Sequence, residues 1–188
     1  MDYYRKSSEK SVLRRNLSLI LIVGLALLLY IDNLNDKPKS KTKLLDVREN
    51  NDAINMYVDY ITHNTDQMKP DHEYSSQALL KLLWATTAAA DFSEVTLDGS
   101  AEKVTRYANN IMENPLKATH AYDIRKAADI LSENLQKIQR EHYPSLASEA
   151  DNVKTAASQI NPDILALQQK DAINNFFLNA GHLLEKIN

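Results

Sequence analysis

The sequence predicts an all-α protein with a single N-terminal transmembrane helix followed by an up-and-down helical bundle of about five to six helices. An uncharged run of mainly Leu, Ile and Val occupies residues 17–31. After this run the apolar residues recur at alternating spacings of three and four, which is the period of an α-helix. The chain has only 3 Gly and 5 Pro, too few for the turns of a β-sandwich, and no segment alternates like a strand.

The apolar run at residues 17–31 is the predicted membrane anchor. Fifteen helical residues span roughly 22 Å, short of the ~30 Å hydrocarbon core. Arg14 and Arg15 can snorkel outward and Tyr30 suits the interface, which covers part of the deficit. A cleaved signal peptide would need a small-x-small site after the run, and none is present. A buried core helix is the third reading, although paired arginines seldom precede one. An uncleaved signal anchor that binds membrane lipid is favoured.

Charge is distributed unevenly along the chain. Residues 1–43 carry a net charge of +5 and residues 44–188 a net charge of −8. An acidic main domain repels phosphate backbones, so we expect no nucleic-acid partner. The arginines before the anchor, with Asp32 and Asp36 after it, favour a cytoplasmic segment 1–16. The main domain is then extracytoplasmic, and periplasmic if the source is a bacterium.

A polar linker is expected between the anchor and the bundle. Residues 32–43 are charged and contain Pro38. Their four lysines could rest on anionic lipid, but a solvated spacer is the simpler reading. The bundle domain then covers residues 44–188. Its helices are expected at about 44–63, 72–92, 100–113, 116–142, 145–160 and 162–187, the last one starting at Pro162.

Two helices carry more apolar surface than one buried stripe requires. Leu80 and Trp84 lie on the opposite side from the main stripe of the second helix. That helix either runs through the centre of the bundle or presents these two residues to a partner protein.

The last helix shows the same excess. At 100° per residue, Ile164, Leu167 and Leu178 fall near the side opposite its broad apolar face. This second side could pack on the linker or the first helix, or dock on another subunit. Phe177 and Leu178 are the residues that we would mutate first.

Motifs for catalysis, metals and cofactors are missing from the sequence. Cysteine is absent, and no histidine has Glu or Asp three positions before it. His120 and Asp123 share a helix face, but two ligands do not make a site. No phosphate-binding loop or nucleophile motif occurs. We therefore expect a non-catalytic protein with no cofactor and no metal.

The leading hypothesis is a membrane-anchored accessory or scaffold subunit of a membrane or envelope complex, which binds one or more membrane-associated protein subunits. The anchor would raise the effective concentration of the bundle near its partner. The alternative is a tethered sensor-type or small-ligand-binding bundle, with Trp84 and the tyrosines lining a pocket between helices. The sequence does not identify the small molecule.

Overall fold

The computed structural model describes residues 39–63, 72–113 and 120–188, and side chains from residue 47 onward. The chain divides into two compact units, Met1–Leu44 and Leu45–Asn188. The predicted anchor at residues 17–31 and the segment 1–16 lie outside the described residues. Within the described ranges, no helix combines the length and apolar character needed to cross a membrane.

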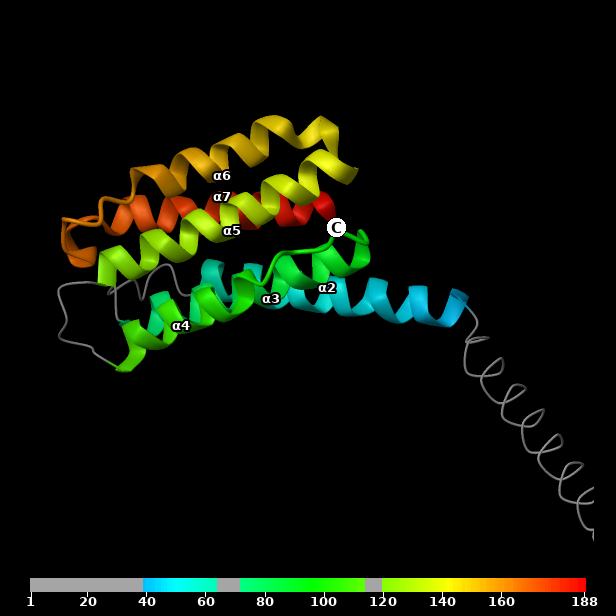
Figure 1. Ribbon diagram of the computed structural model, residues 1–188, viewed down its shortest axis with the longest axis horizontal. Coiled ribbons are helices and arrows are strands. Elements are labelled where there is room, and N and C mark those ends of the chain that lie inside the picture. The colour runs from blue at the N-terminus through cyan, green and yellow to red at the C-terminus, as the bar shows by residue number, and fades with distance from the viewer. Residues whose placement is uncertain (1–38, 64–71, 114–119) are drawn as a thin grey trace, which may run out of the picture. The chain divides into compact units, whose positions relative to one another are not determined.

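The described part of the chain is entirely helical, as the sequence predicts. It contains six α-helices and two short 3₁₀ turns, and none of its residues forms a strand. The elements are α2 (Lys39–His63), α3 (His72–Phe92), α4 (Ser100–Glu113), α5 (His120–His142), η1 (Pro144–Leu146), α6 (Ala147–Gln159), η2 (Ala166–Gln168) and α7 (Lys170–Ile187). Successive helices run in opposite directions, which makes an up-and-down bundle (Figure 1).

Two helix starts differ from the sequence prediction. Helix α2 begins at Lys39, so the last five residues of the predicted linker 32–43 are helical. Helix α7 begins at Lys170 and not at Pro162. The predicted start of α5 near residue 116 falls among residues that the structure does not describe.

The bundle has two layers, one of α2, α3 and α4 and one of α5, α6 and α7 (Figure 1). Helix α3 lies centrally, because it packs against α4 in its own layer and against α5 and α7 in the other. Alanines are frequent at its buried positions, and their small side chains allow neighbouring backbones to approach closely. The fully buried large side chains of the core include Leu79, Leu82, Leu131, Leu135, Phe176 and Phe177.

Helix α2 packs against α7 at Gly181. A Cβ atom at this position would lie 2.9 Å from Cδ1 of Ile61. One turn away, the Tyr57 hydroxyl donates a 2.8 Å hydrogen bond to the carbonyl oxygen of Phe177. This bond satisfies a fully buried phenol. A glycine on α7 and a tyrosine on α2 therefore fix the register of the two helices.

Aromatic rings extend this contact toward α3. The rings of Tyr60 and Tyr74 stack at 5.6 Å, and Tyr74 meets Phe177 edge-on at 6.1 Å. Burial, with a contribution from Tyr74, raises the pKa of Tyr57 well above its ordinary value of 10.0. Burial, with a smaller effect of Tyr60, raises the pKa of Tyr74 to about 12. Both phenols therefore favour the protonated form in the folded protein.

Helix α3 ends in a Schellman motif. The N–H of Val95 donates to the carbonyl of Ala90 at 2.8 Å, and the N–H of Glu94 donates to that of Asp91 at 3.2 Å. This geometry requires a left-handed residue, and Glu94 adopts it with φ of 57°. The side chain of Val95 is buried, which fastens the following segment to the core.

The buried phenols predict a loss of stability at alkaline pH. In the unfolded chain they ionise near pH 10, whereas in the folded chain their pKa values are higher. Their contribution is therefore complete below about pH 10 and is lost as the pH rises through and above this value. Tyr57→Phe should lower the free energy of unfolding near pH 8 by about 1 kcal/mol, because the bond to Phe177 is lost, and should make the alkaline loss shallower.

Urea unfolding followed by circular dichroism near pH 8 and pH 11 measures both effects. The exposed Tyr122→Phe is the control, and it should leave stability near pH 8 unchanged. If Tyr57→Phe matches the parent protein at both pH values, the hydroxyl of Tyr57 does not stabilise the α2–α7 contact.

Candidate functional site

The most exposed cluster of apolar side chains lies in the turn between α6 and α7. Ile164, Leu165 and Leu167 are 40%, 45% and 60% exposed. Single exposed apolar residues are common on protein surfaces, but three within four positions of one turn make this turn the candidate interaction site. The other exposed large apolar side chains among the described residues are Met56, Trp84, Met112 and Tyr122.

The turn begins where α6 stops at Gln159. Ile160 is extended, with ψ of 111°, and its side chain is fully buried. Asn161 and Pro162 follow, and the side-chain oxygen of Asn161 accepts a 2.9 Å hydrogen bond from the N–H of Asp163. This is the bond that an N-cap residue makes to the second residue of a helix, but residues 162–164 form a turn and not a helix. The prediction that Pro162 occupies the first position of α7 is therefore wrong, because α7 begins at Lys170.

Gln169 holds the two ends of the turn together. Its amide nitrogen donates to the carbonyls of Asn161 and Ile164, each at 2.7 Å. Its amide oxygen accepts a 2.8 Å hydrogen bond from the N–H of Asn161. One side chain therefore satisfies three backbone groups across eight positions of the chain.

A residue from α5 fixes the end of α6 from outside. The guanidinium of Arg125 donates to the carbonyls of Ser158 and Ile160, at 2.8 and 3.0 Å. Its Nε also donates to Asp129 at 2.8 Å, which orients the guanidinium. These bonds satisfy carbonyls that the end of a helix leaves without partners.

The arrangement presents aliphatic side chains on a braced backbone. Ile164, Leu165 and Leu167 are apolar and bring no chemistry for catalysis, but they can bury surface against another molecule. Because Gln169 and Arg125 already fix the backbone, little conformational entropy is lost on docking. The turn is therefore suited to binding an apolar surface of a partner.

Two of the predicted interaction residues lie elsewhere than expected. Phe177 is fully buried, so the expectation that it belongs to an exposed docking surface is wrong. Leu178 is only half-buried and packs against the core. Helix α2 contacts α7 near Phe177 and at Gly181, through Tyr57 and Ile61.

The other predicted residues do reach the surface. Ile164 and Leu167 are exposed, but they lie in the turn and η2 and not on the far side of a helix. Trp84 is 41% exposed, and Leu80 is half-buried beside the core. Helix α3 is thus central in the bundle and still presents one ridge to solvent.

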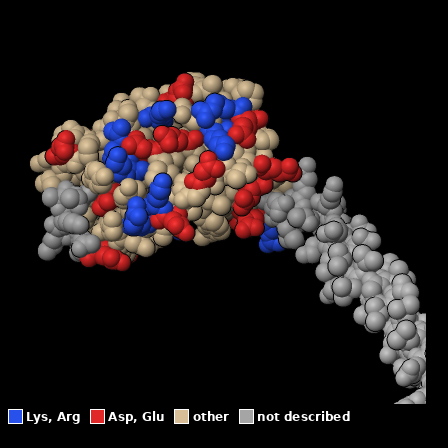
Figure 2. Space-filling model, in the orientation of Figure 1, with Lys and Arg blue, Asp and Glu red and all other residues tan. Residues whose placement is uncertain are grey.

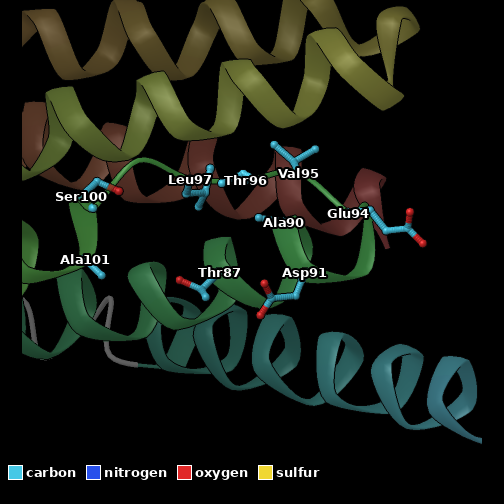
Figure 3. Close-up of a pocket in the computed structure, with 10 residues that line it drawn as sticks. Thr87, Ala90, Asp91, Glu94, Val95, Thr96, Leu97, Ser100 and Ala101 are labelled. Carbon is cyan, nitrogen blue, oxygen red and sulfur yellow. The ribbon is translucent and has the colours of Figure 1, made fainter. Parts of the chain in front are cut away.

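A shallow groove of about 500 Å³ lies between the end of α3, the segment after it and the start of α4 (Figure 3). Thr87, Asp91, Glu94 and Thr96 supply polar and acidic groups to it. Two further grooves have polar or charged linings over α4 and α5. None of these three grooves is lined by Trp84 or a tyrosine, the residues expected around a ligand.

Potential metal ligands are not gathered in the described ranges. No group of three or more His, Asp or Glu side chains there is placed to hold a metal ion. Asp123 is buried in the first turn of α5, and His120 is half-buried at the start of that helix.

Several exposed apolar residues were not anticipated from the sequence. Leu165 falls within the last helix that the sequence predicts from Pro162, whereas the structure places it in the turn before α7. Met56 and Tyr122 lie next to the buried Tyr57 and Ala121 and carry no distinct sequence signal. The consecutive residues Asn161, Pro162 and Asp163 are typical of a turn. They are the one sequence signal that could have identified this site.

Comparison with known families, with curated proteins and with solved structures finds no match to this chain. A function is therefore proposed from the geometry of its own residues.

The clamp formed by Gln169 predicts a local effect of its removal. Gln169→Ala deletes three hydrogen bonds across the turn, so amide exchange in residues 160–169 should become about tenfold faster or more. Hydrogen exchange read by mass spectrometry measures this. The neighbouring exposed Gln168→Ala is the control. Equal exchange rates in the two variants would mean that Gln169 does not brace the turn.

Proposed function

We propose that this chain is a non-catalytic, membrane-anchored accessory or scaffold subunit of a membrane or envelope protein complex. Its bundle docks a protein partner through Ile164, Leu165 and Leu167. The observation that carries the proposal is the exposure of these three side chains on a backbone braced by Gln169 and Arg125. Aliphatic side chains of this kind stabilise an interface through the apolar area that they bury.

The position of the turn in the bundle supports this role. The turn lies at one end of the bundle, opposite the end at which α7 reaches the C-terminus (Figure 1). The docking residues are therefore presented at an end of the bundle and not along its side.

Membrane tethering supplies the second half of the proposal. A chain held by residues 17–31 meets a partner in the same membrane at a raised effective concentration. A modest apolar patch is then sufficient for stable association. We propose that the bundle lies outside the cytoplasm, because arginines precede residues 17–31 and aspartates follow them.

The docking role predicts a position-specific contact. A photo-crosslinking amino acid at position 167 of the full chain, in native membranes, should capture one protein reproducibly. Replacing Ile164 and Leu165 with Ser in the same chain should lower this yield about tenfold, because buried apolar area is lost. Far-ultraviolet circular dichroism should stay unchanged. The matched control carries the crosslinker at exposed His182 on α7. The same product from both positions, or an unchanged yield in the Ser variant, contradicts docking through the turn.

The anchoring role predicts how the full chain behaves in membranes. The protein should stay in the membrane pellet after a carbonate wash and should keep its original N-terminus, because residues 17–31 remain in lipid. In spheroplasts of a bacterial host, added protease should digest the bundle. Release by carbonate, a mature N-terminus beyond residue 31, or a bundle protected from protease would each contradict this part of the proposal.

A further inference from the structure

A second apolar surface follows the line where α2 and α3 run side by side. Met56 is 47% exposed and Trp84 is 41% exposed. Tyr60 and Leu80 are half-buried and pack against the core beside them. We call these four residues the α2–α3 patch. It belongs to different helices from the α6–α7 turn and is independent of it.

Contacts across the two helices set the register of the patch. The ammonium group of Lys81 lies 5.2 Å from the centre of the Tyr60 ring. Met56 is one turn before Tyr60 on α2, and Trp84 is one turn after Lys81 on α3. Because the helices are antiparallel, moving backward along α2 and moving forward along α3 lead toward the same end of the helix pair. Met56 and Trp84 therefore lie at similar heights along the two helices, and Leu80 is one turn before Trp84 on α3.

The surroundings of the patch are acidic. In residues 47–63 and 72–92, five exposed carboxylates stand against two basic side chains. The carboxylates are those of Glu49, Asp52, Asp59, Glu73 and Asp91. Of the two basic side chains, Arg48 pairs with Asp52 at 3.9 Å, and Lys81 lies over Tyr60.

The positions of these carboxylates place them around the apolar centre. Glu49 is seven positions before Met56, and Asp91 is seven positions after Trp84, so each lies two turns away on the same helix face. Figure 2 shows acidic side chains gathered at the end of the bundle where α2 begins, whereas lysines and arginines lie mainly over α4, α5 and α6. The patch is thus an apolar strip in a negative field.

We propose that the α2–α3 patch binds an amphipathic helix of a partner protein, with an apolar stripe bordered by Lys and Arg. Two parallel rows of side chains along adjacent helices match the way a helix lays its apolar face against a groove. Trp, Tyr and Met are enriched at such interfaces. The carboxylates around the strip select a basic partner and repel an acidic one.

Trp84 is the only tryptophan of the chain, so its fluorescence reports on this site alone. The probe is a synthetic helical peptide of leucine and lysine with its leucines on one face, added to the full chain in phosphatidylcholine vesicles. The expected result is a saturable blue shift of the Trp84 emission that weakens as salt is raised. A peptide with glutamate in place of lysine should produce no shift.

Variants separate the apolar and the charged contributions. Met56→Ser with Leu80→Ser should raise the Kd of the leucine–lysine peptide about tenfold. Asp52→Asn with Asp59→Asn should raise it about three- to tenfold. Leu165→Ser with Leu167→Ser, in the α6–α7 turn, is the matched control and should leave the Kd unchanged. If the α6–α7 turn proves not to be a docking site, the proposal for the α2–α3 patch is unaffected. If the α2–α3 patch does not bind the peptide, the proposal for the turn is likewise unaffected.

Four outcomes would overturn the proposal. The first is an equal blue shift with the glutamate peptide, and the second is an unchanged Kd in both α2–α3 variants. The third is a blue shift that appears without peptide as the protein concentration rises, which would assign the patch to a second copy of the chain. The fourth is a blue shift on adding anionic vesicles alone, which would assign it to a lipid surface.

Discussion

Helix α2 packs against α7 at Phe177 and Gly181, through Tyr57 and Ile61. A Cβ atom at position 181 would lie 2.9 Å from the terminal methyl group of Ile61, so a larger side chain there would require Ile61 to shift. At the distance that glycine allows, Tyr57 reaches the Phe177 carbonyl and satisfies a phenol that is otherwise costly to bury. Tyr60 then stacks on Tyr74 of α3. These contacts hold α2 beside α7 and α3, with Met56 of α2 and Trp84 of α3 both exposed.

The same contact explains how the bundle divides its apolar residues between core and surface. Helix α7 is covered on one side by α6 and on the other by α2, so its aromatic side chains, including Phe177, are internal. Five of the seven exposed large apolar side chains among the described residues lie at two places, and Met112 and Tyr122 lie elsewhere. One is the braced turn with Ile164, Leu165 and Leu167, and the other is the α2–α3 patch in its acidic surroundings. A bundle with a closed core and two separate apolar surfaces suits a protein that joins other molecules, and this is the basis of the scaffold role proposed above.

Helical periodicity was sufficient to predict the helical class and the ends of α3 and α4, because aligned apolar residues and turn signals agree there. It could not predict the start of α7. Asn161 and Pro162 are also a common pair at a helix start, and only the folded structure brings Gln169 back to bond the turn. Periodicity also showed that α7 has two apolar sides, but not which neighbour covers the second one. That depends on Gly181 meeting Ile61 from a helix 120 positions earlier, a contact between residues far apart in sequence. The exposure of Met56 and Trp84 depends on the same long-range packing.

The central claim is that the absence of a side chain at position 181 holds α2 in place. Hydrogen exchange of Gly181→Val, compared with His182→Val at the adjacent exposed position, tests it most directly. The account predicts that amides of α2 lose protection in Gly181→Val while those of α5 and α6 keep theirs, and that His182→Val exchanges like the parent protein. Unchanged protection of α2 in Gly181→Val would contradict it, because α2 would then be held by contacts that do not depend on this glycine.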